Sequence, residues 1–413
     1  MNSLEYAKSL DSQDNLSEAR NLFHIPKNNN TDFTYLCGHS LGLQPKNAYS
    51  YVKTELDSWK NFAVEGHMHG DNPWLDYHAL LNKPMSKIVG SKYKETVVMN
   101  SLTTNLHLLM ISFFKPSKYK NKIIIDTPAF PSDKYAVQSQ LKLHGLNPEK
   151  NLIEINTLRN NKCISKEEML EQIKLHINDA AMILLSGVNY YTGQFYDIKS
   201  IAKLANKHEC IIGLDLAHAA GNVTLQLNKW GVDFASWCGY KYLNGGPGAP
   251  SGAFINEKYY NQNLNRLEGW WGHDKKTRFN PPEKFNPINS AEAWQLSNPP
   301  ILSMAALRSS LILFDKVGMD SLIDKSKNLT GYLEYLIKEM DHKNISIITP
   351  SNKQERGSQL SLEIKSNTDI EKFFRAKNII CDFRKPNVIR AAPCALYNSY
   401  NDIYDFVNVL KQL

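Results

Sequence analysis

The chain has 413 residues, of which 42% are hydrophobic and 22% are charged, so it can bury a large core and is not a disordered chain. Its 48 basic residues exceed its 41 acidic ones, which gives a mild net charge of +7 that suits an anionic small molecule. No apolar run reaches the roughly 18–20 residues that cross a bilayer, and no block of lysines and arginines marks a nucleic-acid-binding patch.

The first thirty residues are polar and predict a helix followed by a loop that ends at 28–30. They lack the apolar core of a secretory signal. Two amphipathic helices are expected at 45–62 and 73–89. Six scattered cysteines form no Cys-x-x-Cys pair, so we expect a reducing, cytoplasmic location and neither a zinc site nor a redox pair.

Short apolar runs then alternate with helical segments. Strands are predicted at 96–99, 122–126, 152–155, 180–185, 211–215, 233–237 and 252–255. Helices are predicted at 105–114, 132–144, 165–177 and 197–207. Continuous apolar strands separated by helices are typical of a parallel sheet that is covered on both faces, so the pattern predicts an α/β domain.

The C-terminal third has a different pattern. It predicts helices at 299–317, 320–340, 368–377 and 399–412, and strands at 344–348, 359–364 and 387–391. We therefore expect three parts. An N-terminal segment (1–75) contributes to the small domain and the active site, a large α/β domain spans 76–310, and a smaller α+β domain spans 311–413.

An acidic residue ends one of the most apolar strands. Asp215 follows Ile211–Leu214, and His218 comes three residues later. A carboxylate in this place costs desolvation unless it caps a helix or pairs with a cation. One such cation is the protonated pyridine nitrogen of a cofactor. The sequence leaves both interpretations open.

A lysine follows the next predicted strand. Lys241 lies between Tyr240 and Tyr242, ahead of the glycine-rich segment 245–248. Most lysines in loops are solvated. Flanking aromatic rings would desolvate this amine and favour a nucleophilic role. The glycines match neither GxGxxG nor GxxxxGK[ST], so no nucleotide loop is indicated.

Two further strand ends suit a planar, phosphorylated cofactor. Residues 100–104 (NSLTT) precede a helix, whose N-terminal N–H groups bind phosphate, although an ordinary Ser/Thr cap is commoner. Phe130 follows strand 122–126 and can stack on a ring, or it belongs to a turn in which Ser132 or Asp133 caps the next helix. A pyridoxal phosphate (PLP) site on a parallel sheet requires these parts in a set order along the chain: a phosphate site, an aromatic ring, Asp-x-x-His and then Lys.

Longer motifs extend through nearly the whole chain. The most specific are LLSGVNYYTGQFYDI (184–198) and WGVDFASWCGYKYLNGGPG (230–248). They are joined by YLCGHSLGLQPK (35–46), SLTTNLHLLMISFFKP (101–116), GWWGH (269–273), SNPPI (297–301), ITPSNKQERGSQL (348–360) and IRAAP (389–393). On these motifs the sequence resembles the kynureninase family, the PLP-dependent hydrolases of tryptophan degradation.

The resemblance implies a type I PLP-dependent (aspartate aminotransferase-like) fold and a homodimer with shared active sites. It implies hydrolytic Cβ–Cγ cleavage of L-kynurenine to anthranilate and L-alanine, in the pathway that feeds NAD synthesis. It also implies cleavage of 3-hydroxy-L-kynurenine to 3-hydroxyanthranilate and L-alanine. In this family, the residue types found here at His67, Ser297 and Asn298 accompany a preference for the 3-hydroxylated substrate.

The resemblance also assigns site residues. Lys241 corresponds to the lysine that bonds to the cofactor, Asp215 pairs with the pyridine nitrogen, and Tyr240 helps to hold the cofactor. The reaction also needs an acid–base group near the γ-carbon of the substrate, and Tyr240 beside Lys241 is the candidate. The remaining cofactor positions are Leu102, Thr103, Phe130, Pro131, Ser132, Asp133, Ser186 and His218, together with Trp270 and Asn298 from the partner subunit. Arg390 corresponds to the arginine that binds the substrate α-carboxylate. Ser40, His67 and Asn298 correspond to positions at the aryl end of the substrate.

Two positions depart from the family pattern. Gly38-His39 stands where the family usually has an Asp-Asn pair before Ser-Leu-Gly, and Trp271 follows Trp270 where the family often has Phe. Other functions remain alternatives. An aminotransferase or a cysteine desulfurase would keep the fold, but a desulfurase needs a reactive cysteine on a mobile loop, and Cys381 and Cys394 lie in or after predicted strands.

Two more distant alternatives fit less well. A non-catalytic binding protein of the same fold has no need of Lys241, Asp215 and Arg390 together, and a nucleic-acid-binding module would need a basic patch. The His67-Met68-His69 segment lacks a third metal ligand, so no metal is expected.

Overall fold

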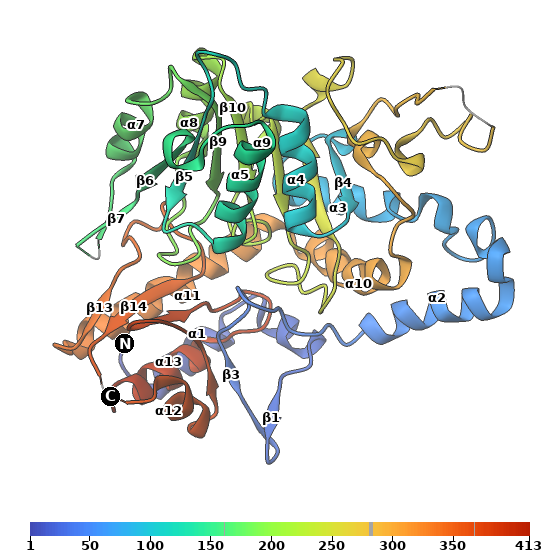
Figure 1. Ribbon diagram of the computed structural model, residues 1–413. Helices are drawn as coiled ribbons and strands as arrows, with labels where there is room; N and C mark the ends of the chain where they lie inside the picture. The colour runs from blue at the N-terminus through green and yellow to red at the C-terminus, as the bar shows by residue number, and fades with distance from the viewer. Residues whose placement is uncertain (161, 281–283, 367) are drawn as a thin grey trace.

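The central apolar runs form one seven-stranded sheet in the computed structural model, which describes residues 1–160, 162–280, 284–366 and 368–413 (Figure 1). In spatial order the strands are β4 (Thr96–Met99), β12 (Ser251–Ile255), β11 (Phe234–Trp237), β10 (Ile211–Asp215), β9 (Ala180–Ser186), β5 (Lys122–Thr127) and β6 (Leu152–Asn156). The strands from β11 to β6 are parallel, as predicted. β12 is antiparallel to both of its neighbours, because no helix crosses the sheet between β11 and β12.

Alternate residues of the inner strands belong to two separate hydrophobic cores, one on each face of the sheet. Ile124 and Ile183 pack in the core that includes α3, α7, α8 and α10, whereas Ile123 and Met182 pack in the core that includes α4 and α5. These helices are α3 (Ala79–Val89), α4 (Leu102–Phe113), α5 (Pro131–Leu143), α7 (Lys166–Lys174), α8 (Ile198–Lys207) and α10 (Ile301–Val317). Burial on both faces explains why the strands are continuous apolar runs.

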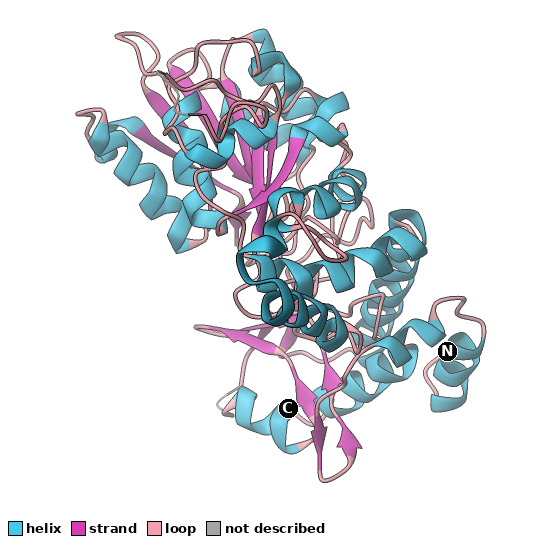
Figure 2. Cartoon of the chain, turned by 90° about the vertical axis from the view of Figure 1, so that its right-hand side faces the viewer, coloured by secondary structure: helices cyan, strands magenta, loops and turns pink. Residues whose placement is uncertain are grey.

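A third core lies in the C-terminal part of the chain, apart from the large sheet (Figure 2). It is formed by a four-stranded antiparallel sheet, with strand order β13-β14-β17-β16, and by three helices. These elements are β13 (Ile345–Ile347), β14 (Leu360–Ile364), β16 (Asp382–Arg384), β17 (Val388–Ala391), α11 (Met319–Met340), α12 (Ile370–Ala376) and α13 (Tyr400–Leu410). The predicted α+β character of this region is confirmed.

The N-terminal segment is attached to this third core. Helix α1 (Leu4–Ser12) lies beside α13, and Asp11 accepts hydrogen bonds from the backbone N–H groups of Tyr400 and Asn401 at 2.7 and 3.0 Å. Strand β3 (Thr34–Tyr35) pairs with β15 (Ile379–Ile380). Both terminal helices therefore pack in the third core, through Ala7 of α1 and Leu410 of α13. The boundaries at residues 75 and 310 stay a prediction.

Helix α2 (Ala48–Phe62) runs away from the body of the molecule and contacts α10 (Figure 1). It exposes large apolar side chains along its length: Tyr49 is 72% exposed, Trp59 62% and, just beyond the helix, Val64 76%. Several large apolar side chains therefore remain in contact with solvent on and just beyond this helix.

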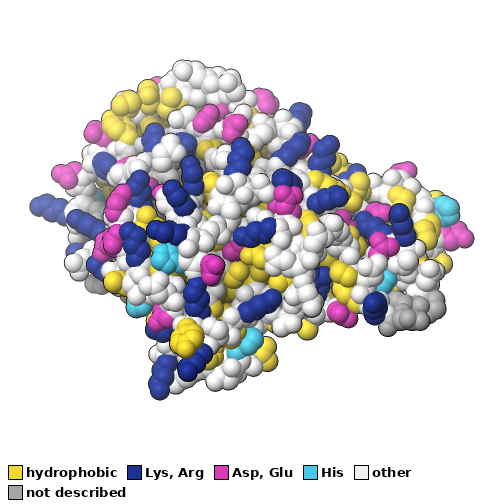
Figure 3. Space-filling view, turned by 90° about the horizontal axis from the view of Figure 1, so that it is seen from above, with side chains coloured by type: hydrophobic (Ala, Val, Ile, Leu, Met, Phe, Trp, Pro, Cys, Tyr) yellow, Lys and Arg dark blue, Asp and Glu magenta, His cyan; other side chains and the backbone are white. Residues whose placement is uncertain are grey.

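Several short elements give no signal in the sequence. They are β1 (Lys27–Asn28), β2 (Thr31–Asp32), β7 (Leu158–Arg159), β8 (Lys162–Cys163), α6 (Pro148–Asn151) and α9 (Leu227–Trp230), together with β15 and β16. No helix in the described ranges is long and apolar enough to cross a membrane. On the face seen in Figure 3, lysines and arginines are interspersed with acidic residues.

Candidate active site

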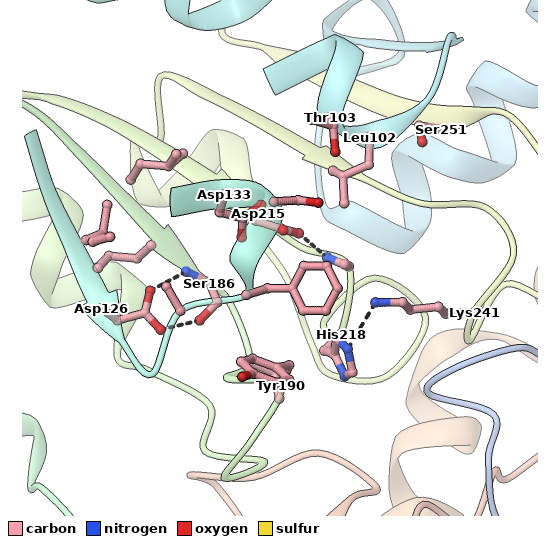
Figure 4. A pocket seen from close by; sticks show the side chains of 18 of the residues that line it. Leu102, Thr103, Asp126, Asp133, Ser186, Tyr190, Asp215, His218, Lys241 and Ser251 are labelled. Carbon is pink, nitrogen blue, oxygen red and sulfur yellow. Dashed lines mark hydrogen bonds between the residues drawn. The ribbon is translucent and has the colours of Figure 1, made fainter. Parts of the chain in front are cut away.

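A pocket opens at the carboxyl ends of β5, β9 and β10, where ligands bind in sheets of this kind (Figure 4). It collects ten of the residues singled out from the sequence: Leu102, Thr103, Phe130, Ser132, Asp133, Ser186, Asp215, His218, Tyr240 and Lys241. They come from segments as far apart as α4 and the β11–β12 connection. Pro131 begins α5 and is not among the residues that line the pocket.

Lys241 contributes its side-chain amine to this pocket (Figure 4). Its Nζ lies 3.0 Å from Nε2 of His218 and 5.6 Å from the centre of the Phe130 ring. Burial, reinforced by the neighbouring charges of Lys241 and Arg390, holds the pKa of His218 well below its ordinary value. The imidazole is therefore neutral and accepts a hydrogen bond from Lys241, while its Nδ1 has no partner in the described part of the chain.

Two buried carboxyl groups lie at one end of the pocket. Asp215 ends β10, and its Oδ1 accepts a hydrogen bond from the N–H of Ala217 at 2.7 Å. Burial, and then the nearby Asp215 carboxylate, raises the pKa of Asp133 well above its ordinary value. Oδ1 of Asp133 makes no hydrogen bond among the described residues. Burial and the neighbouring carboxyl group therefore favour the neutral form of Asp133 at this end of the pocket.

The start of α4 lies at another side of the pocket. Asn100 adopts a left-handed conformation (φ 49°), which Asn tolerates better than most residues, and its side chain donates to Asn105. Ser101 is the N-cap but makes no side-chain capping bond. The first N–H groups of the helix, at Leu102 and Thr103, are therefore available to an anion, and the helix dipole adds to the attraction.

These features fit the phosphate, the ring, the aldehyde and the ring nitrogen of PLP. The uncapped helix start suits its phosphate, Phe130 its ring, Lys241 its aldehyde and the Asp215–Asp133 pair its ring nitrogen. The partnerless Oδ1 of Asp133 and Nδ1 of His218 are buried polar atoms that a bound group can satisfy.

Asp126 is a pocket residue that the sequence analysis missed. Buried at the end of β5, it accepts hydrogen bonds from the N–H and hydroxyl of Ser186 at 2.9 and 2.5 Å. It also accepts from Asn189 and Tyr196, each at 3.0 Å. The hydroxyl proton of Ser186 is thereby committed to Asp126. The sequence did hold a signal for Asp126: it is an acidic residue at the end of the apolar run 122–126, as Asp215 is at the end of 211–215.

Tyr240 also lines the pocket. Burial, and then the neighbouring Cys238, raises the pKa of its phenol to about 12. Its backbone carbonyl accepts a hydrogen bond from Gly42 at 2.8 Å, which fixes the N-terminal loop against the pocket. The phenol is protonated at neutral pH and can act as a proton donor.

Arg390 and Ser40 lie together beyond the pocket. Arg390 is 1% exposed, and its Nη1 donates to the carbonyl of Tyr190, a residue that lines the pocket, at 2.7 Å. Its Nη2 lies 3.5 Å from Oγ of Ser40. A carboxylate held here is therefore close to the cofactor pocket.

Three further predicted residues also lie outside the pocket of their own chain. His67 bonds through Nδ1 to the carbonyl of Val64 and packs against Trp74. Trp270 is 45% exposed and donates to the carbonyl of Arg278 at 2.7 Å. Asn298 is exposed.

Comparisons with known proteins agree with one another. The family model for the kynureninase C-terminal domain matches residues 322–410. The kynureninase of Myxococcus xanthus is 47% identical over 98% of this chain and 96% of its own length. That of Flavobacterium psychrophilum is 45% identical over 100% of this chain and 98% of its own.

Solved structures show the same fold at low identity. The cysteine desulfurase of Thermococcus onnurineus superposes with a TM-score of 0.74 at 16% identity and covers 92% of this chain and 94% of its own. A mutant of C-DES with glycine covalently linked to its PLP cofactor gives 0.77 at 14% identity, over 92% and 97% of the two chains. The predicted type I PLP-dependent fold is confirmed.

Proposed function

The chain belongs to the kynureninase family, and from that membership we propose that the pocket around Lys241 hydrolyses the Cβ–Cγ bond of L-kynurenine, releasing anthranilate and L-alanine. The protein is a PLP-dependent hydrolase of tryptophan catabolism. The observation that carries the assignment of the site is that one pocket joins an amine, a carboxyl pair and an uncapped helix start. When bound, PLP supplies an electron-withdrawing ring that stabilises negative charge on the carbon beside the substrate amine.

Lys241 is proposed to move the proton of the substrate Cα. A base must lie within hydrogen-bonding reach of the proton that it takes, and Nζ of Lys241 is the amine that enters the pocket. His218 is neutral and accepts a hydrogen bond from Lys241 at 3.0 Å. It therefore orients the amine without placing a second positive charge beside it.

Asp215 is proposed to hold the proton of the cofactor ring nitrogen. A buried carboxylate stabilises a cationic N–H next to it by a charge-assisted hydrogen bond. The raised pKa of Asp133 favours its neutral form, which leaves Asp215 as the proposed partner of the positive charge. A second ionised carboxylate would leave a buried charge without a partner.

Tyr240 is proposed to donate a proton near the γ-carbonyl of the substrate. The pKa of about 12 keeps its phenol protonated at neutral pH, so the proton is available for transfer to the substrate. Arg390 is proposed to hold the substrate α-carboxylate, because a buried guanidinium binds a carboxylate with two parallel hydrogen bonds. The resemblance predicts Ser40 at the aryl end of the substrate, but its Oγ lies 3.5 Å from Nη2 of Arg390, so we propose that it assists Arg390 at the carboxylate instead.

We propose a homodimer in which His67, Trp270 and Asn298 complete the partner's site. Two observations support this. These residues do not line their own pocket, and α2 exposes a row of apolar side chains beside α10. We further propose that 3-hydroxykynurenine is preferred, with His67, Ser297 and Asn298 near its hydroxyl group.

The cysteines do not favour a desulfurase. Burial raises the pKa of Cys394 to about 12 and that of Cys381 well above its ordinary value. Reactive cysteines carry a lowered pKa, whereas the raised pKa values keep both thiols protonated, and Cys394 is also buried.

The test is product analysis with the purified holoenzyme. L-kynurenine should give anthranilate and L-alanine in equal amounts, and 3-hydroxykynurenine should give a higher kcat/KM. Consumption of a keto acid with formation of a new amino acid would instead indicate an aminotransferase. A kcat/KM that favours kynurenine would contradict the proposed preference alone.

A further inference from the structure

The surroundings of Arg390 are built around Asp382, a residue that no motif singled out. Asp382 on β16 lies directly opposite Arg390 on β17 in the antiparallel register. Opposite charges at such cross-strand positions attract each other. Asp382 is mostly buried and Arg390 fully so, so removing the carboxylate would leave a buried guanidinium without its main partner, which is costly.

Asp382 occupies one edge of the guanidinium. Nε of Arg390 donates to its Oδ1 at 2.9 Å, and Nη2 lies 2.8 Å from its Oδ2. Nη1 donates to the carbonyl of Tyr190 at 2.7 Å. Three of the five N–H groups of Arg390 are therefore committed. Among the described residues, the second N–H of Nη1 has no partner, and that of Nη2 reaches only Oγ of Ser40 at 3.5 Å.

The charges around Asp382 do not balance. Arg384 also contacts its carboxylate, with Nη2 3.1 Å from Oδ2, so two guanidinium groups share one carboxylate. His39 is fully buried nearby, but burial and the surrounding cations hold its pKa well below the ordinary value, so it adds no charge. Ser40 is neutral and donates to Oδ2 of Asp382 at 3.2 Å. The described cluster therefore retains one positive charge, which one carboxylate would neutralise.

We propose that Asp382 is a positioning residue for substrate recognition. It holds Arg390 by the Nε edge, so that the remaining N–H groups on Nη1 and Nη2 point together at the substrate α-carboxylate, with Ser40 beside them. This inference rests on the proposed function of the site. It assigns Asp382 no contact with the reacting atoms.

The test compares two ligands on the holoenzyme: L-kynurenine and its decarboxylated analogue, which lacks only the α-carboxylate. Asp382→Asn keeps the shape of the side chain but cannot accept both Arg390 bonds. We expect KM for L-kynurenine to rise roughly 10- to 100-fold with a smaller change in kcat, because a misplaced binding group costs affinity on this scale. Calorimetry should show the same loss of affinity for L-kynurenine and no loss for the analogue.

Matched variants separate positioning from damage. Asp324→Asn makes the same chemical change at an exposed residue of α11 and should leave both affinities unchanged. Asp382→Glu keeps the charge and should restore part of the affinity if the asparagine variant folds poorly. Equal losses for both ligands, or an unchanged KM in Asp382→Asn, would overturn the positioning role. If the holoenzyme binds L-kynurenine but releases no anthranilate, the proposed function is overturned. The comparison of the two ligands' affinities would still test the positioning role of Asp382.

Discussion

Two buried histidines lie near Lys241 without adding positive charge to the site. Burial is the largest cause of the lowered pKa of both His218 and His39, and the neighbouring cations add to it. His218 has a partner in Lys241, but neither ring nitrogen of His39 has one among the described residues. A buried polar atom without a partner costs about 1–3 kcal/mol, so His39 is a source of instability in the substrate-free protein.

The state of His39 predicts a pH dependence of stability. The folded pKa lies below the unfolded value of about 6.5, so the unfolded chain binds a proton that the folded chain does not, and stability falls as the pH falls below that value. Between pH 7.5 and 5.5, the wild type should lose about 1.4 kcal/mol more unfolding free energy than His39→Asn. Urea denaturation at both pH values, at equal protein concentration, measures the difference. An equal loss in the two proteins would show that His39 takes up its proton as readily in the folded chain as in the unfolded chain, and would contradict the lowered pKa.

The two carboxyl groups of the pocket should respond differently to the same substitution. The raised pKa of Asp133 favours its neutral form, so Asp133→Asn puts a neutral group of the same shape in its place and should lower kcat by less than about 10-fold. Asp215→Asn removes the negative charge and should lower kcat by about 100-fold or more. Steady-state kinetics on L-kynurenine compares the variants. The reverse order would mean that Asp133 carries the charge.

At the scale of elements, the helix starts and strand ends bring the site together. The apolar runs predicted the inner strands because burial on both faces leaves a continuous signal. The antiparallel direction of β12 and the short strands β15 and β16 were missed, because two- or three-residue strands have no periodicity to detect. Asp382 was missed for the same reason, since its role depends on pairing with β17.

The start of α4 predicts a specific effect on cofactor affinity. Leu102 is its first residue, a position that accepts proline, and Ser101 before it is extended (φ −104°, ψ 163°), as a residue before proline prefers. Leu102→Pro removes one N–H and should raise the dissociation constant of PLP about 10-fold or more, the worth of one hydrogen bond to a charged group. Leu102→Ala loses the same packing but keeps the N–H and is the control. Absorbance titration of the apoprotein measures both, and equal affinities would exclude this N–H as a phosphate ligand.

At the scale of the whole molecule, a single chain leaves the predicted site incomplete. Ten of the predicted residues line one pocket, whereas Trp270 and Asn298 are exposed on the surface of the chain. Positions that act across an interface cannot be found from the spacing or periodicity of one chain. Their assignment came from the resemblance, and it stays a prediction.

Subunit mixing tests the shared site. Lys241→Ala and Asn298→Ala homodimers should each be nearly inactive, because every site lacks one needed residue. A hybrid dimer should recover activity, because one of its two sites combines an intact Lys241 with an intact Asn298. Co-expression with two affinity tags and assay of the doubly purified hybrid gives the measurement. No recovery in a folded hybrid would place both residues in the same subunit's site.

The most direct test of the central claim is to locate the cofactor on the chain. The holoenzyme would be reduced with borohydride, which fixes PLP to the amine that holds it, then digested and analysed by peptide mass. We expect the added mass on Lys241 alone, and we expect the reduced enzyme to release no anthranilate from L-kynurenine. A label on another lysine, or full activity after complete labelling of Lys241, would contradict this expectation.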